Sequence, residues 1–318
     1  MNQIIIVIIV GKLLAFLREK IVAYYLGVSE EYGLFLYVTA IGVAVLTIQA
    51  YVINWAVVPD YKNKINDFDR LSIDTLLRDS LKISLFFMAA AVLGYGIWIL
   101  SDQELIKYTE SKYIKIVVLI LALIPVSAFG NCLSALANVC EKKIISLLLP
   151  SITSITTIFY LILQDLKNSS PESLGLCYAL LFAALIYILT SLFFLKDNLT
   201  IKKTGKKEAG IEINRVLFGL IAIESVPQLI SVLERKVFLG VNRNLSELAA
   251  FNYAINLYSF IISIAIIFVG QLFYPNMEKL TKRHVVDQRK TLTMVMIVAL
   301  LVTILLGSKQ ILNPHNQN

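Results

Sequence analysis

The uncharged run GLFLYVTAIGVAVLTIQAYVINWAVV, residues 33–58, decides the fold of this chain. A bilayer core about 30 Å thick is crossed by a helix of roughly 20 apolar residues, so this run predicts a membrane-spanning helix. By the same criterion, spanning helices are predicted at residues 3–26, 33–58, 80–100, 115–137, 144–164, 174–195, 216–240, 249–274 and 291–307. The predicted fold is therefore an all-α polytopic membrane protein with about nine transmembrane helices.

The composition of the whole chain indicates the same class of protein. Hydrophobic residues make up 58% and charged residues 16% of the 318 residues, whereas soluble globular proteins contain about 45–50% and about 25%. The mean hydropathy is +0.75. One soluble core could not bury this many apolar side chains, so the surplus requires contact with membrane lipids. A cytoplasmic enzyme, a nucleic-acid-binding domain and a disordered scaffold are thereby excluded.

The net charge of +7 is explained by the positions of the basic residues. With a cytoplasmic N-terminus, 18 of the 29 Lys and Arg residues fall in cytoplasmic loops, six in outer loops and the tail, and five inside helices. An excess of basic residues in cytoplasmic loops is the positive-inside pattern of multi-pass membrane proteins. It predicts a cytoplasmic N-terminus, and it explains the positive charge without a nucleic-acid partner.

Two segments of the chain resemble each other at a fixed spacing. AFLREKIV (15–22) aligns with SVLERKVF (231–238), and each copy is followed by a helix expected to end at a proline, Pro59 or Pro275. Because an even number of predicted helices separates the copies, both insert the same way round, which predicts two parallel helical lobes. The predicted domains are a six-helix N-terminal lobe at 1–195, a basic cytoplasmic linker at 196–215 and a partial C-terminal lobe of about three helices at 216–318. The second lobe is expected to be incomplete, which implies a missing C-terminal half or a partner subunit.

Polar residues inside the predicted first and seventh helices are the candidate functional residues. A charge near the bilayer centre costs roughly 2.5–3.5 kcal/mol on insertion scales, so such a residue usually faces a cavity or a partner. The candidate substrate-binding residues are Lys12, Arg18, Glu19 and Lys20 in the first helix and Glu224, Gln228, Glu234, Arg235 and Lys236 in the seventh. Lys12 and Glu19 are two helical turns apart and therefore share a helix face. Pro227 is the candidate hinge, since proline removes a backbone hydrogen bond and is expected to break the helix there.

These residues also have plainer interpretations. Lys20 and Lys236 lie nearest the predicted outer surface, and their long side chains could extend to the lipid headgroups. Glu224 and Pro227 could belong to an ordinary kinked helix. The sequence leaves both interpretations open.

The usual motifs of enzymes and metal sites are missing from the sequence. GxSxG, HExxH, Walker A and GxGxxG do not occur, so we do not expect an enzyme. DFD (67–69) imitates a metal-binding DxD, but its loop is too short for a nucleotide-binding domain, which favours a solvated loop. Cys132, Cys140 and Cys177 are widely spaced and are expected to be small buried hydrophobic residues rather than a disulfide or zinc framework. No metal or cofactor is expected, apart from a coupling cation of unknown identity.

The segments GKLLAFLREKIVAYYLG (11–27) and VVPDYKNK (57–64) resemble the opening of the MurJ/MviN family of lipid II flippases. That family belongs to the multidrug/oligosaccharidyl-lipid/polysaccharide exporter superfamily. SVPQLISVLERKVFLG (225–240) is similar to the family's seventh helix. By this resemblance, Lys12 and Arg18 take the places of two first-helix arginines that line a cationic cavity. An arginine there suits a diphosphate, because its planar fork can bind two oxygens at once.

The resemblance implies a transporter of the bacterial inner membrane. It would move an undecaprenyl-diphosphate-linked saccharide, such as lipid II, to the outer leaflet by alternating access, and an O-antigen or capsule unit fits about as well. Two other classes stay open. A small-cation exporter of the same superfamily would depend on Glu19 and Glu224 and not on Arg18. A non-transporting remnant or a membrane interaction partner would fit the incomplete second lobe.

Overall fold

The computed structural model describes residues 2–200 and 215–273, apart from gaps at 69–70, 102, 168, 170–171 and 243. Its helices are α1 (Asn2–Leu26), α2 (Glu30–Phe68), α3 (Ile73–Ser101), α4 (Gln103–Val139), α5 (Lys143–Ser146), α6 (Leu148–Leu166), α7 (Ser173–Leu195), α8 (Arg215–Asn242) and α9 (Leu245–Phe273). A 3-10 turn, η1 (Lys196–Asn198), and two short strands, β1 (Leu71–Ser72) and β2 (Leu199–Thr200), complete the described elements. The predicted helix at 291–307 lies outside the described residues. The chain divides into two compact units, Met1–Ala250 and Phe251–Asn318, and the contacts below belong to the first.

The described part of the chain is an all-α fold with several helices suited to a membrane. Five of its helices are long and apolar enough to cross one, at Glu30–Ile65, Ile73–Ser101, Tyr113–Val139, Leu148–Leu166 and Ser173–Asn198. The chain is therefore a multi-pass membrane protein of the all-α class. A total of nine spanning helices and the arrangement in two lobes stay predictions.

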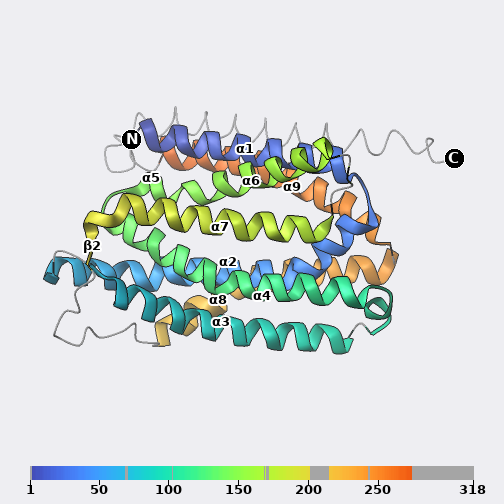
Figure 1. Ribbon diagram of the computed structural model, residues 1–318, viewed down its shortest axis with the longest axis horizontal. Coiled ribbons are helices and arrows are strands. Elements are labelled where there is room, and N and C mark those ends of the chain that lie inside the picture. Colours follow the sequence, from blue (N-terminus) through green and yellow to red (C-terminus); the bar gives the residue numbers. More distant parts are fainter. Residues whose placement is uncertain are drawn as a thin grey trace, which may run out of the picture. The chain divides into compact units, whose positions relative to one another are not determined.

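Helix α2 lies at the centre of the first unit. It packs against α3 and α4, and α4 packs against α7, so that these four helices lie lengthwise beside one another (Figure 1). Gly42 of α2 permits the close approach to α4, since a Cβ at this position would lie only 2.0 Å from Cγ2 of Ile120. Further along α2, Ile53 and Val57 join Leu133 of α4 in a fully buried apolar cluster.

Helices α3 and α7 expose many large apolar side chains on the outside of the first unit. Leu93 and Ile97 on α3 and Leu189 and Phe193 on α7 are all exposed. Exposed apolar surface of this kind is unfavourable in water and is the surface that a helix shows to lipid. The exterior thus agrees with the membrane assignment made from helix length and hydropathy.

One end of the first unit is closed by polar and backbone contacts. β1 follows α2, β2 follows α7, and the two strands pair in parallel with Leu71 beside Leu199. Next to them, Lys142 Nζ donates hydrogen bonds to the Phe194 carbonyl oxygen at 2.7 Å and to Asn198 Oδ1 at 3.0 Å. We call this the β end of the unit (Figure 1).

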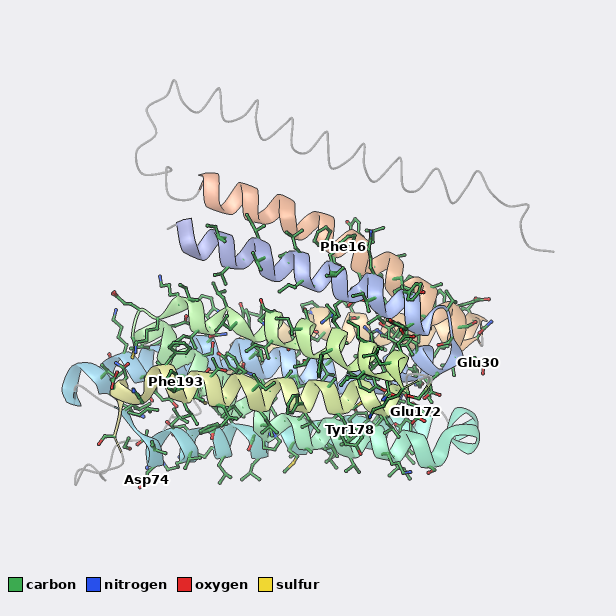
Figure 2. The ribbon with its side chains drawn as sticks, turned by 45° about the horizontal axis from the view of Figure 1, so that its top comes forward. Phe16, Glu30, Asp74, Glu172, Tyr178 and Phe193 are labelled. Atoms are coloured by element: carbon green, nitrogen blue, oxygen red, sulfur yellow. The ribbon has the colours of Figure 1, made fainter. Side chains whose placement is uncertain are left out.

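The opposite end is also closed by a polar contact between distant segments. Glu31, in the first turn of α2, accepts hydrogen bonds from the backbone N–H of Ser173 at 3.3 Å and from its hydroxyl at 2.8 Å. A carboxylate at the first residue of α7 complements the positive N-terminal end of the helix dipole. We call this the Glu31 end; Figure 2 shows Glu30 here and Asp74 at the β end. In the predicted orientation, the β end is cytoplasmic and the Glu31 end faces outward.

Helix α2 continues well past its predicted end. The sequence predicts that the helix stops at residue 58, before Pro59, but α2 extends to Phe68. A proline inside a helix removes one hydrogen bond and crowds the preceding turn. Here the turns after it are stabilised by the burial of Tyr61 and by an ion pair between Asp60 and Lys64, four residues apart. The hydropathy pattern therefore located the start of the charged residues, whereas the helix continues to Phe68.

The predicted interruption at Pro227 is also wrong, because α8 is a single helix from Arg215 to Asn242. The predicted helix at 144–164 is instead divided. Leu147 N–H bonds to the carbonyl of Ile144, three residues back, and this tight turn separates α5 from α6. Pro150 then lies in the first turn of α6. Backbone N–H groups in the first turn make no hydrogen bond within the helix, so a proline there removes none.

Candidate functional site

The first group of predicted site residues lies on α1, which packs against α6. Arg18 Nε and Nη2 both donate to Oε1 of Glu19, at 3.0 and 2.5 Å. The side chains keep 29% and 19% of their surface exposed. A guanidinium has five N–H donors in a planar fork, so this pairing occupies only part of its capacity. Arg18 is thus a half-buried cation whose partner is its own neighbour on the same helix.

Two further cations lie on α1. Lys20 is exposed, and its Nζ lies 5.1 Å from the ring centroid of Phe16, one turn earlier. Lys12 is half-buried and lies six residues before Arg18 on the same helix. Gly11 faces α6 closely, since a Cβ there would lie 3.1 Å from Ser151 Oγ. The charges of this helix therefore occur on an element that also packs against the bundle.

The second group lies on α8, which packs against α2. Arg235 Nη1 donates to the carbonyl oxygen of Leu36 at 2.8 Å. Lys236 Nζ donates to Ser101 Oγ at 2.6 Å and lies 5.3 Å from the ring centroid of Trp98. These contacts place both cations at the Glu31 end, against α2 and α3.

The remaining candidates on α8 lie along the same helix. Glu224 and Gln228 are half-buried, whereas Pro227 and Glu234 are exposed. The charged side chains of α1 interact with other residues of α1, whereas the two α8 cations interact with α2 and α3. We therefore describe the predicted site as two groups, the α1 group and the α8 group.

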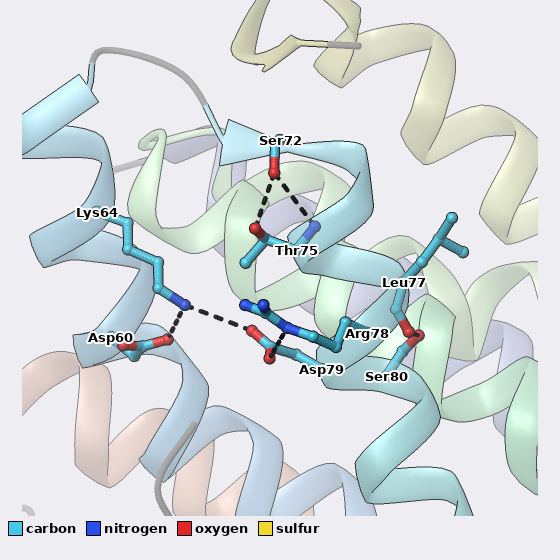
Figure 3. Close-up of polar contacts among 8 residues, drawn as sticks. All are labelled: Asp60, Lys64, Ser72, Thr75, Leu77, Arg78, Asp79 and Ser80. Atoms are coloured by element: carbon cyan, nitrogen blue, oxygen red, sulfur yellow. Dashed lines mark hydrogen bonds and ion pairs between the residues drawn. The ribbon is translucent and has the colours of Figure 1, made fainter. Parts of the chain in front are cut away.

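A third polar cluster, at the β end, escaped the sequence analysis (Figure 3). Lys64 Nζ pairs with Asp60 Oδ2 at 2.7 Å within α2 and with Asp79 Oδ2 of α3 at 3.5 Å. Arg78 Nε lies 3.9 Å from the other oxygen of Asp79. Lys64 and Asp79 are both buried, although hydropathy assigns the stretch from 59 to 79 to a solvated loop. The four-residue spacing of Asp60 and Lys64 is visible in the sequence, but the pairing with Asp79 depends on α2 and α3 folding back on each other.

Gln49 is a second polar residue that the sequence analysis passed over. Its side chain is 0% exposed in the middle of α2, and neither amide atom has a hydrogen-bond partner among the described residues. A buried polar group without a partner costs about 1–3 kcal/mol. The unpaired amide of Gln49 therefore destabilises the fold within a predicted membrane-spanning helix.

The described part of the chain holds no group of three or more His, Cys, Asp or Glu side chains arranged to hold a metal ion. Comparison of the chain with protein-family models and with curated proteins gives no match.

Proposed function

We propose that this chain is a transporter of the bacterial inner membrane that moves an undecaprenyl-diphosphate-linked saccharide to the outer leaflet. The substrate is lipid II or a related polysaccharide unit, and the motion is alternating access. The observation that supports this proposal most is the Arg18–Glu19 pair, a half-buried guanidinium and carboxylate on a helix that is mostly apolar. Placing such a charge in the membrane costs free energy, so we expect it to be kept for binding a partner of opposite charge.

The chemistry of Arg18 suits a diphosphate. Its fork can donate two parallel hydrogen bonds to phosphate oxygens, and such charge-assisted bonds are roughly twice as strong as neutral ones. Glu19 balances the guanidinium when no substrate is bound, and an arriving diphosphate competes with it. Lys12, on the same helix, adds a second positive charge for an anion that carries more than one negative charge.

The rest of the proposal concerns the motion. Nine spanning helices in two parallel lobes, the second incomplete, would provide the two halves that move against each other. Pro227 lowers the number of backbone hydrogen bonds in α8, and bending there would contribute to the movement. Glu224 and Gln228 lie beside it, and Glu224 is the natural position for a coupling cation.

The test is flipping of a fluorescent lipid II by the full chain in liposomes, read by an added quencher. We expect Arg18→Ala to lower the initial rate at least tenfold, because losing a charge-assisted hydrogen bond costs about 1.5–3 kcal/mol. Arg18→Lys should retain part of the activity, since it keeps the charge and loses the fork. Lys167→Ala, an exposed cation at the end of α6, is the matched control and should flip normally.

Parallel assays with an O-antigen-type lipid separate the two classes of saccharide. Normal flipping by Arg18→Ala would show that the assigned role is wrong. In a separate assay of cation efflux from the same liposomes, loss of activity in Glu19→Gln and Glu224→Gln, with Arg18→Ala unaffected, would favour the cation exporter. A wild-type chain that flips neither lipid would contradict the flippase and would favour the cation exporter or the non-transporting alternative.

A further inference from the structure

The β end contains a lysine that is shared between two carboxylates (Figure 3). Lys64 Nζ lies 2.7 Å from Asp60 Oδ2 on its own helix, α2, and 3.5 Å from Asp79 Oδ2 on α3. The longer contact is the ion pair that joins α2 to α3 in the described part of the chain. Lys64 therefore keeps a close partner of opposite charge even when Asp79 loses its charge.

The two carboxylates differ in their access to water. The Asp79 side chain is 0% exposed, whereas that of Asp60 is 31% exposed. Both residues fall within helices that are long and apolar enough to cross a membrane. An ionisable side chain in such a helix is costly to insert, and proton relays are one of its usual functions. The partly exposed Asp60, which shares its lysine with Asp79, gives a proton a route from the solvent to the buried carboxylate.

The other groups around Asp79 come from α3, β1, α2 and α4. On α3, Arg78 Nε lies 3.9 Å from Asp79 Oδ1, and the Arg78 side chain is 42% exposed. The Thr75 hydroxyl, one turn before Asp79, is 2.7 Å from the hydroxyl of Ser72 on β1. The electrostatic neighbours of Asp79 on α2 and α4 include the Tyr61 hydroxyl and the Cys132 thiol. The two cations and two carboxylates of this cluster balance, so one added proton gives it a single positive charge.

Tyr61 supplies an acceptor for a proton on Asp79. The Tyr61 side chain is 0% exposed, and its hydroxyl has no hydrogen-bond partner among the described residues. Buried polar groups are nearly always paired, so this hydroxyl points to a further hydrogen bond at the cluster. A neutral carboxyl group carries an O–H that donates, and a phenolic oxygen accepts. Protonated Asp79 is thus a donor that the buried Tyr61 hydroxyl matches.

We propose that Asp79 is a proton-binding site that exchanges with the solvent at the β end through Asp60. Proton uptake turns the Asp79 carboxylate into a neutral carboxyl group, breaks its ion pair with Lys64 and leaves Lys64 paired with Asp60. The link between α2 and α3 is lost, yet no buried charge is left without a partner, which is what makes the change inexpensive. In the predicted orientation the proton comes from the cytoplasm, and its binding loosens the cytoplasmic end of the first unit. This site goes beyond the proposed function and does not depend on which molecule the chain transports.

Infrared difference spectroscopy of the purified full chain measures the protonation directly. A neutral carboxyl group has a carbonyl stretch that a carboxylate lacks, and the band of a buried group is separated from that of solvated ones. We expect this band to appear when a weakly alkaline buffer is made weakly acidic. Asp79→Asn should abolish it, and Asp74→Asn, an exposed aspartate five residues earlier on α3, should leave it unchanged. Asp60→Asn removes the second partner of Lys64, so the band should then need a more acidic buffer to form.

The loosening is measured at Cys132, a buried thiol of α4 in the same apolar cluster as Tyr61. In a Cys140→Ser/Cys177→Ser background, Cys132 is the sole thiol of the chain. Asp79→Asn holds the neutral form at any pH. At one fixed pH we expect it to react with N-ethylmaleimide about tenfold faster than the background chain, because local opening exposes the thiol.

The controls separate proton binding from misfolding and from transport. Asp79→Glu keeps a carboxyl group at the site and should shift the infrared band without abolishing it. A band of unchanged size in Asp79→Asn, or equal labelling of Cys132 in Asp79→Asn and Asp74→Asn, would overturn the proposal. Neither measurement uses a lipid, so a chain that shows both effects and flips nothing contradicts the transporter and supports the proton site.

Discussion

Lys64 and Asp79 are the two charged side chains that the described part of the chain buries. Each lies in a predicted loop, yet the ion pairs with Asp60 and between α2 and α3 draw them inside. Removing one partner of a buried ion pair is much more harmful than removing both, because the remaining charge keeps its desolvation penalty. Lys64 is therefore a residue on which the stability of the β end depends.

We expect Lys64→Met to lower the free energy of unfolding by about 3–5 kcal/mol, the usual effect of breaking a buried pair from one side. The methionine fills similar space but leaves the Asp60 and Asp79 carboxylates without the shared ammonium. The measurement is denaturant-induced unfolding of the purified chain in detergent.

Lys62→Met is the matched control, since Lys62 is exposed two residues earlier on the same helix and should change stability by less than about 0.5 kcal/mol. The double variant Lys64→Met/Asp79→Asn should recover part of the loss. Equal stability of Lys64→Met and Lys62→Met would mean that the cluster is as solvated as the sequence suggests.

Single residues show where prediction from sequence reaches its limit. The charges on α1 and α8 are predictable, because a lysine or arginine inside an apolar run stands out by itself. Their partners are not, because the Leu36 carbonyl and Ser101 lie far from Arg235 and Lys236 in the chain and become neighbours only when α8 packs. The roles of these residues in binding stay predictions.

The contact between α2 and α4 depends on the absence of a side chain at Gly42. A Cβ there would lie 2.0 Å from Ile120 Cγ2 and 2.9 Å from the hydroxyl oxygen of Tyr95, which itself bonds to the Val38 carbonyl at 3.0 Å. We expect Gly42→Ala to lower the free energy of unfolding by about 1–3 kcal/mol through overpacking. Thermal unfolding in detergent measures this.

Gly96→Ala on α3 is the control, because nothing lies within 4 Å of a Cβ added there. Alanine favours the helical state over glycine by up to about 1 kcal/mol, so this variant should be neutral or slightly more stable. A destabilised Gly96→Ala, or a neutral Gly42→Ala, would contradict the packing.

The bounds of helices were predictable from the sequence where a helix faces lipid, and less so where it packs against other helices. The predicted span 174–195 agrees closely with α7, an uncharged run exposed on its outer side. The predicted span 33–58 misses the last turns of α2, since these are polar and owe their helical form to contacts with neighbouring helices. The helix end predicted at Pro59 and the interruption predicted at Pro227 are wrong, because a proline removes one backbone hydrogen bond and the turns on both sides of it stay helical.

The predicted orientation of the whole chain can be tested with its own cysteines. Cys132 and Cys177 are buried, whereas Cys140 is half-buried near the β end. Burial raises the pKa of the Cys140 thiol, against the opposing effect of the Lys142 charge. Only the thiolate reacts, so labelling is slow at neutral pH and becomes faster as the pH rises.

We expect a membrane-impermeant maleimide at about pH 8.5 to label the chain in inverted vesicles and not in intact spheroplasts, because Cys140 faces the cytoplasm when the N-terminus does. Cys140→Ser should abolish labelling. Labelling of spheroplasts alone would reverse the predicted orientation of every helix.

The pairing of β1 with β2 sets an order of events during synthesis. Leu71 and Leu199 are 128 residues apart in the chain. At elongation rates of about 5–20 residues per second, the later strand leaves the ribosome roughly 6–26 s after the earlier one. Until then β1 waits without its partner, and the strands can join only once α3 to α7 have been made. The pairing therefore has to follow the synthesis of α3 to α7, whereas α8, which begins at Arg215, is made only after both strands.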